Sequence, residues 1–335
     1  MSIKIANISH SQNIAIGNVV LPGCAFLAPM AGISDAPFRS LAARFGAAMA
    51  VSEMIASAGL LTGAKDVVRK LGPCGSLPHM VQLSGFQEQW MVRGAQMAVA
   101  AGAQIIDINL GCPSKRVTNG YAGSALMRVP DKALKLIEAV ARAVNVPVTV
   151  KMRLGWDENS LNAAAIANSA QSAGVKMFVV HGRTRQQFYK GKARWQLVSE
   201  VVKAVNVPVI VNGDIVDINS ADKALAASGA AGVMVGRAAQ GRPWLVGQIN
   251  AHLLALPVSP APQGNALGVL VGEHYQAMLK SYGDELGVRV ARKHLRWYLE
   301  AAGVKMPKNL LTQKDPARVV EMIAGAFSSP VRVAA

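Results

Sequence analysis

Short apolar runs recur along the chain between residues 25 and 235, and segments of mixed polarity separate them. Most of the runs are continuously apolar rather than alternating, which is typical of strands buried on both faces of a parallel sheet. We therefore expect eight buried strands at 25–28, 47–51, 79–83, 105–108, 147–150, 177–180, 208–211 and 232–235.

The segments between the runs are long enough for crossover helices, which we expect at 88–101, 131–144, 160–173 and 220–227. Gly102, Gly174 and Gly229 follow three of these helices, where a helix C-cap commonly requires glycine. Eight strand–helix units over about 250 residues predict a (β/α)8 TIM barrel. A doubly wound open sheet is the alternative, which is disfavoured because no Gly-x-Gly-x-x-Gly follows an early strand.

A second region is expected after the barrel. Residues 256–264 read Leu-Pro-Val-Ser-Pro-Ala-Pro-Gln-Gly and are predicted to form a linker. No strand-like run follows, so we expect a small helical domain at 265–327 and a tail at 328–335. The barrel would then occupy residues 1–255 as the catalytic domain.

Composition and charge narrow the class of protein. Of the 335 residues, 51% are hydrophobic, which indicates a globular chain with a large core. The formal net charge of +16 favours a polyanionic partner, with nucleic acid as the first candidate. The alternative is a generally basic surface without a specific partner.

No continuous apolar span long enough for a bilayer and no signal-peptide block are evident, so we expect no membrane association. The cysteines, at positions 24, 74 and 112, are widely spaced and lack metal-like pairing. This usage favours the reducing cytoplasm. We expect a monomer with no obligate protein partner and no metal.

Polar residues terminate nearly every predicted strand. In a barrel these ends meet at one opening, which would then be a ligand site. Asn212-Gly213-Asp214 and Gly236-Arg237 follow the last two strands, where barrels commonly hold a phosphate, so a phosphate-bearing cofactor is expected. The remaining strand ends carry Pro29-Met30, Ser52-Glu53, Gln82, Asn109, Lys151 and His181.

Cys112 lies in the loop Asn109-Leu-Gly-Cys-Pro-Ser-Lys115, directly after the fourth predicted strand. A glycine-rich stretch at 119–124 follows and could flex over a ligand. A cysteine on a polar strand-end loop favours a chemical role. The alternative is that Cys112 is a small buried hydrophobe.

Two basic stretches could contact nucleic acid. Residues 181–195 contain five cations, three aromatics and no acid, and cations with aromatics suit phosphates and unpaired bases. Arg289, Arg292, Lys293 and Arg296 share one face of a predicted helix. The alternatives are a solvated loop and a solvated helix face.

The assembled motifs resemble the tRNA-dihydrouridine synthase family, in order and spacing, from about residue 15 to 300. The stretches at 236–244 and 291–299 resemble its bacterial DusB-like branch. The matching motifs are Leu27-Ala-Pro-Met-Ala-Gly-Ile-Ser-Asp35, Ser52-Glu-Met54, Asp107-Ile-Asn-Leu-Gly-Cys-Pro-Ser114, Gly123-Ser-Ala-Leu126, Lys151-Met-Arg-Leu-Gly-Trp156, His181-Gly-Arg-Thr184, Asn212-Gly-Asp214 and Gly236-Arg-Ala-Ala-Gln-Gly-Arg-Pro-Trp244.

The resemblance implies reduction of uridine in tRNA to 5,6-dihydrouridine, with FMN as cofactor and NADPH (or NADH) as reductant. Hydride would pass from the flavin to uracil C6, and Cys112 would protonate C5. The implied cofactor contacts are Pro29, Met30 and Ala31 bordering the flavin, Gln82 and Lys151 bonding its ring, His181 nearby, and Asn212, Gly213, Asp214, Gly236 and Arg237 holding its phosphate and ribityl chain.

For the substrate, the resemblance places Asn109 and Arg153 where they would orient the uracil. Lys115 and Arg116 should face tRNA phosphates, because cations directed at the thiol would favour thiolate over the acid form. The further residues that we expect to contact tRNA are Arg183, Arg185, Arg292, Lys293 and Arg296.

Two competing functions remain open. The first is a flavin-dependent barrel oxidoreductase acting on a small pyrimidine-like substrate, which would explain the polar opening but not the basic stretches. The second is a non-catalytic RNA-binding protein, which would need no intact polar opening.

Overall fold

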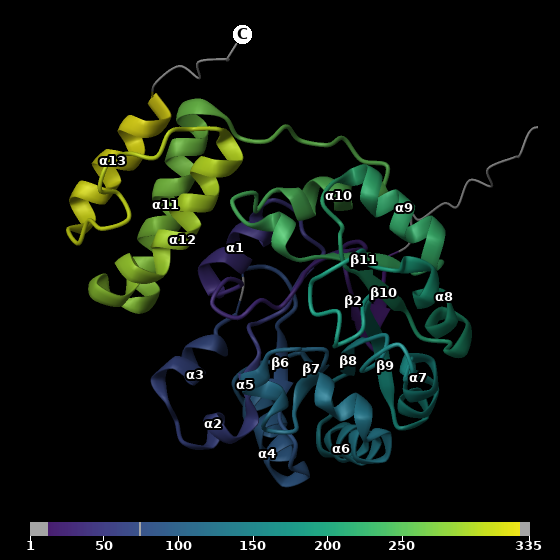
Figure 1. The fold of residues 1–335 in the computed structure, drawn as a ribbon. Helices are drawn as coiled ribbons and strands as arrows, with labels where there is room; N and C mark the ends of the chain where they lie inside the picture. Colours follow the sequence, from purple (N-terminus) through teal and green to yellow (C-terminus); the bar gives the residue numbers. More distant parts are fainter. Residues whose placement is uncertain (1–12, 74, 329–335) are drawn as a thin grey trace, which may run out of the picture.

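The computed structural model describes residues 13–73 and 75–328. Cys74 and the predicted tail after Ser328 lie outside these ranges. Within them, the chain forms a barrel that carries helices on its outside, and a group of three further helices packs at one side (Figure 1).

The main sheet contains nine strands, and every pair of neighbours in it is parallel. Each of the eight predicted runs overlaps one of its strands, although five strands extend beyond the predicted bounds, and only the short β5 was not predicted. The strands are β3 (Ala25–Leu27), β4 (Met49–Ala50), β5 (Ile55–Ala56), β6 (Met80–Ser84), β7 (Ile105–Leu110), β8 (Val148–Arg153), β9 (Val175–His181), β10 (Val209–Asn212) and β11 (Gly232–Val235).

The order of the strands decides between the two predicted architectures. From β3 to β11 the strands follow chain order around the sheet, and β11 returns to pair with β3. A bridge between Val51 and Met80 joins the end of β4 to β6. The (β/α)8 barrel is therefore confirmed, and the open-sheet alternative is wrong.

Helices surround the barrel because their apolar positions recur every three or four residues. In α6, for example, Ala133, Leu136, Ile137 and Val140 are all buried. Gly229 ends α9 in the left-handed conformation with φ 65°, as the C-cap prediction requires. The barrel helices are α1 (Ala36–Arg44), α2 (Ser57–Leu61), α3 (Lys65–Lys70), α4 (Glu88–Ala100), α5 (Lys115–Thr118), α6 (Pro130–Ala143), α7 (Ala163–Ser172), α8 (Trp195–Ala204), α9 (Ile218–Ser228) and α10 (Leu245–Leu253), with 3-10 turns η1 (Gly123–Arg128) and η2 (Arg237–Ala239).

A short hairpin precedes the barrel and was not predicted. Its strands β1 (Ala15–Ile16) and β2 (Val19–Val20) are antiparallel, and Ile16 is buried. The side chain of Asn250 in α10 holds the start of β3, because its oxygen accepts the backbone N–H groups of Cys24 (2.9 Å) and Ala25 (3.1 Å).

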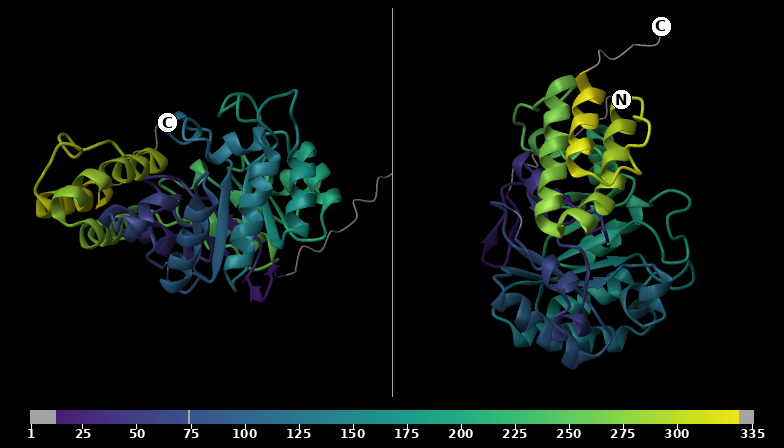
Figure 2. Two further views of the ribbon diagram at one scale, coloured as in Figure 1. Left: turned by 90° about the horizontal axis from the view of Figure 1, so that it is seen from below. Right: turned by 90° about the vertical axis from the view of Figure 1, so that its left-hand side faces the viewer.

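The C-terminal part is helical, as predicted. Helices α11 (Gly264–Tyr282), α12 (Asp284–Ala302) and α13 (Pro316–Ser328) build a second hydrophobic core that also takes in Leu41 of α1 and Trp244. Figure 2 shows these helices beside the barrel, next to α1. No helix in the described ranges is both long and apolar enough to span a bilayer. The predicted contacts of Arg292, Lys293 and Arg296 with tRNA, which would make this part a tRNA-binding domain, stay a prediction.

Candidate active site

A cavity of about 500 Å³ opens where the barrel strands end. All of the residues predicted to bind the cofactor line it, together with Cys112, Asn109, Arg153 and Arg183. Lys115, Arg185, Arg292, Lys293 and Arg296 are not among its lining residues. The cofactor residues that it brings together are Pro29, Met30, Ala31, Gln82, Lys151, His181, Asn212, Gly213, Asp214, Gly236 and Arg237.

A chain of polar side chains begins beneath the cavity floor at Asp107 and reaches the cavity lining at Gln82 and Asn109. The carboxylate of Asp107, 1% exposed, accepts the amide N–H of Gln82 at 2.7 Å and the hydroxyl of Thr149 at 2.6 Å. The carbonyl oxygen of Gln82 in turn accepts the side-chain N–H of Asn109 at 2.7 Å. Burial raises the pKa of Asp107, although the bonds from Gln82 and Thr149 oppose this effect.

The loop that carries Cys112 is held from two sides. The Asn109 oxygen accepts the backbone N–H groups of Gly111 (3.0 Å) and Cys112 (2.8 Å). The Cys112 carbonyl accepts the backbone N–H (3.1 Å) and hydroxyl (2.8 Å) of Ser124. The stretch that was predicted to flex therefore supports this loop. Cys112 is half-buried and lines the cavity, whereas Cys24 is buried.

Cations give the cavity a positive potential. Burial and the neighbouring Arg153 lower the pKa of Lys151 to about 8, and its ammonium donates to Asn212 Oδ1 at 3.1 Å. His181 lies 3.3 Å from Arg183 through Nε2, and because a guanidinium only donates, this nitrogen accepts. Burial and the surrounding cations hold the pKa of His181 well below its usual range, so the ring is neutral.

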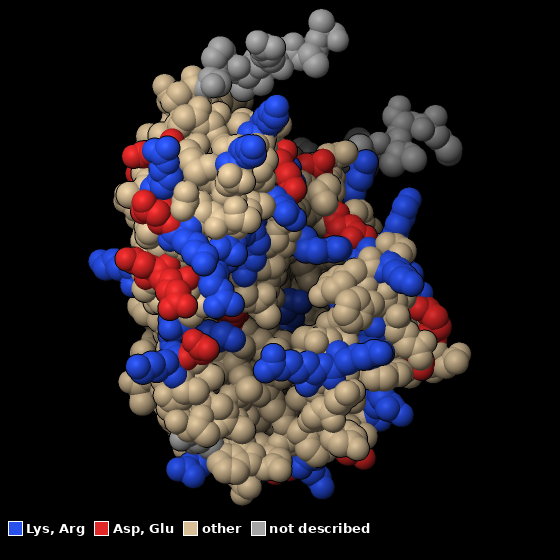
Figure 3. All heavy atoms as spheres, turned by 60° about the vertical axis from the view of Figure 1, so that its left-hand side comes forward, with Lys and Arg blue, Asp and Glu red and all other residues tan. Residues whose placement is uncertain are grey.

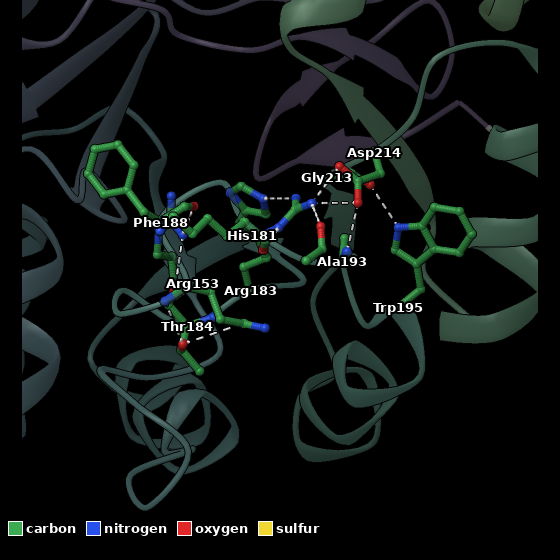
Figure 4. Close-up of polar contacts among 12 residues, drawn as sticks. Arg153, His181, Arg183, Thr184, Phe188, Ala193, Trp195, Gly213 and Asp214 are labelled. Carbon is green, nitrogen blue, oxygen red and sulfur yellow. Dashed lines mark hydrogen bonds and ion pairs between the residues drawn. The ribbon is translucent and has the colours of Figure 1, made fainter.

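Arg183 and Asp214 form an ion pair across two loops (Figure 4). Arg183 Nη2 donates to the two carboxylate oxygens at 2.8 and 2.6 Å and to the carbonyl of Gly191 at 2.7 Å. Asp214 also accepts the backbone N–H of Ala193 at 2.7 Å. Both side chains therefore hold the loop after β9 in place. This geometry gives Arg183 a supporting role in the loop, and its predicted contact with the substrate stays a prediction.

Arg153 is a second connecting side chain. It donates from Nε to the Gly111 carbonyl at 2.8 Å and from Nη1 to the carbonyls of Thr184 and Phe188, each at 2.8 Å. The ring of Tyr189 lies under two guanidinium groups, 4.7 Å from Arg237 and 5.6 Å from Arg153. Phe188 and Tyr189 also line the cavity. The sequence signalled them only as aromatics within a basic stretch.

The remaining predicted tRNA contacts lie outside the cavity. Lys115 and Arg116 are exposed, which agrees with the expectation that neither points at the thiol. Arg185 stacks on Trp156 at 4.6 Å. On α12, Arg296 is exposed, whereas Arg292 and Lys293 are half-buried.

Comparison with known proteins identifies the family. The family model for dihydrouridine synthase (Dus) matches residues 26–323. The chain belongs to the dihydrouridine synthase family. It is 52% identical, over 95% of its length and 98% of the relative's, to a probable tRNA-dihydrouridine synthase of Rhodobacter capsulatus. It is 44% identical to tRNA-dihydrouridine synthase B of Pseudomonas putida, over 85% of each chain. The resemblance noted in the sequence is confirmed.

Solved structures share the barrel with this member of the dihydrouridine synthase family. Histamine dehydrogenase from Rhizobium sp. 4-9 matches with a TM-score of 0.56 and 12% identity, over 80% of this chain and 51% of that one. The 6-hydroxypseudooxynicotine amine oxidase of Pseudomonas geniculata N1 matches with a TM-score of 0.55 and 13% identity, over 80% and 52%. The chain spans about half the length of these enzymes, and at such low identity the likeness concerns the fold.

Basic side chains are prominent on one face of this dihydrouridine synthase family member. Figure 3 shows lysine and arginine side chains gathered around a hollow in the middle of one face. Basic groups lie there both above and below the hollow, and acidic groups are interspersed at its margin. Such a distribution suits an extended polyanion that covers the hollow.

Proposed function

We propose that this enzyme reduces specific uridines in tRNA to 5,6-dihydrouridine, with FMN as its cofactor and NADPH as its reductant. The observation that carries the proposal is the cavity itself, which unites Cys112 with Lys151 and two glycine-bordered strand ends in a chain of this family. The basic surface around the hollow supports a polyanionic substrate. The proposal also includes a cytoplasmic location and a monomeric enzyme.

The residues present fit a flavin mononucleotide. The cavity volume of about 500 Å³ suits a ligand of this size. Lys151, with a pKa of about 8, is charged at neutral pH and can bond an electron-rich ring, and Gln82 offers an amide beside it. Arg237 and the glycines at 213 and 236 lie after the last two strands, where barrels hold phosphate.

The chain's own residues would divide the reaction between them. When bound, FMN supplies the hydride that goes to uracil C6. Cys112 donates its thiol proton to C5, and its backbone is fixed because its N–H donates to Asn109 and its carbonyl accepts from Ser124. Asn109 and Arg153, which also line the cavity, orient the uracil. The target base must leave its stack, which costs little for a loop nucleotide.

The test uses the purified, flavin-loaded enzyme with NADPH and tRNA that lacks modifications. We expect dihydrouridine in the product tRNA, measured by mass spectrometry of nucleosides, and no turnover of free uridine. Comparable turnover of free uridine would favour the small-pyrimidine reductase instead. Colourless protein without tRNA turnover would favour a non-catalytic RNA-binding protein. Replacing NADPH by NADH in the same assay tests the preference for the reductant.

A further inference from the structure

Asp107 is a buried carboxylate that does not belong to the cavity lining but lies directly beneath it. On β7 it precedes Asn109 by two residues, so both side chains point into the barrel. Its strand partners are Gln82 on β6 and Thr149 on β8, and each donates one hydrogen bond to it. The carboxylate therefore sits one layer below the residues that face the ligand.

The amides above Asp107 form a chain with a single direction. Both carboxylate oxygens of Asp107 accept hydrogen bonds, one from Thr149 and one from Gln82, so Gln82 turns its NH2 group toward Asp107 and its oxygen toward Asn109. Asn109 must then turn its NH2 toward Gln82 and its oxygen toward the N–H groups of Gly111 and Cys112. A reversed Gln82 would set its NH2 against the NH2 of Asn109, leaving buried donors unpaired.

We propose that Asp107 is a positioning residue for uridine reduction, because it fixes the direction of the Gln82–Asn109 amide chain and thereby the backbone that carries Cys112. This inference rests on the proposed function. Asp107 is not among the residues that line the cavity, and it acts through the position of its carboxylate oxygen. The step that depends on it is the transfer to uracil, which needs Asn109 and Cys112 in register.

A different role for the same residue would be electrostatic, since Lys151 is a nearby cation. Two conservative substitutions separate the roles. In Asp107→Asn the oxygen can still accept from Gln82 while the new NH2 donates to the Thr149 hydroxyl, so the position is kept and the charge is lost. In Asp107→Glu the charge is kept, but the added methylene displaces the carboxylate by about 1.5 Å.

The experiment measures the two half-reactions of the flavin-loaded enzyme by stopped-flow absorbance. For Asp107→Glu we expect tRNA to oxidise the reduced flavin about 10²-fold more slowly than in wild type, the typical cost of displacing reacting groups by an ångström. Flavin reduction by NADPH requires neither Asn109 nor Cys112, so Asp107→Glu should slow it far less than the reaction with tRNA, even though Gln82 lines the cavity. Asp107→Asn should stay close to wild type in both half-reactions.

Thr149→Val is the matched control, because it removes a bond of similar length from the other oxygen of the same carboxylate, away from the amide chain. We expect nearly wild-type rates for Thr149→Val. A merely structural role of Asp107 would instead slow Thr149→Val and Asp107→Glu alike. Asp107→Val replaces Asp107→Glu should the glutamate variant not fold. A slow Asp107→Asn with a fast Asp107→Glu, or a wild-type rate for Asp107→Glu, would overturn the inference. A wild-type enzyme without tRNA turnover would instead refute the proposed function.

Discussion

Replacing Asp214 by asparagine should destabilise the protein by removing the countercharge of a buried guanidinium. The side chain of Arg183 is 2% exposed, and its Nη2 bonds both oxygens of Asp214. Arg183 also lies in a group of cations, because Arg153, Lys151 and Arg237 are its neighbours around His181. Loss of the Asp214 charge would leave this group without a countercharge. Breaking a buried pair in this way typically costs about 3–5 kcal/mol.

We expect about 3 kcal/mol, the low end of that range, because the side chain of Asp214 is still 32% exposed and is partly screened by water. For a barrel of this size the change corresponds to a fall of roughly 6 °C in Tm. Urea denaturation of the purified protein, followed by circular dichroism, measures the difference as a shift of the midpoint at constant slope.

Asp217→Asn provides the matched control three residues away. Asp217 is the N-cap of α9, where it accepts the N–H of Ser220 at 2.7 Å, and asparagine caps a helix about as well as aspartate. Its variant should therefore lie within about 0.5 kcal/mol of wild type. Equal stabilities for the two variants would refute the reasoning, because the buried pair would then contribute nothing beyond an exposed carboxylate.

Three further outcomes are expected. Cys112→Ala should keep its flavin but lose about 10²- to 10⁴-fold in dihydrouridine formation, and wild-type turnover by this variant would exclude the general-acid role. The affinity for tRNA, measured by filter binding, should fall about 10³-fold between 50 and 200 mM salt if about six phosphates are contacted; affinity independent of salt would contradict the electrostatic account. Because Lys151 has a pKa of about 8, it loses its charge as the pH rises through that value, so FMN affinity should fall by up to about tenfold per pH unit above pH 8. Fluorescence titration checks this, and Lys151→Met should show no such fall.

The barrel could be predicted from the sequence because its strands are continuously apolar, and parallel strands buried on both faces require that pattern. The lining of the cavity followed from the same rule, since the carboxyl ends of parallel strands meet at one edge. The hairpin β1–β2 and strand β5 could not be predicted because each strand has only two residues and, unlike the equally short β4, none lies in a longer apolar run such as 47–51.

Contacts between distant loops could not be predicted in this way. Arg183 and Asp214 are 31 residues apart, and either residue alone is an ordinary polar loop residue. Lys293 shares a helical face with other cations, yet docking of α12 against the barrel leaves it half-buried, with Asp35 and Glu53 near enough to influence its pKa. Such placements depend on how whole elements pack, which local periodicity does not encode.

The three carbonyl bonds of Arg153 have a mechanical consequence. Its strand, β8, lies between β7 and β9. The Arg153 side chain therefore links the loop after β7, which carries Cys112, to the loop after β9, which carries Phe188. An RNA that displaced Phe188 on binding would also displace Gly111, the neighbour of Cys112, because both carbonyls bond the Arg153 guanidinium. Binding of tRNA would thus be coupled to the position of Cys112. A free nucleoside that does not reach Phe188 would lack this coupling and would be a poorer substrate.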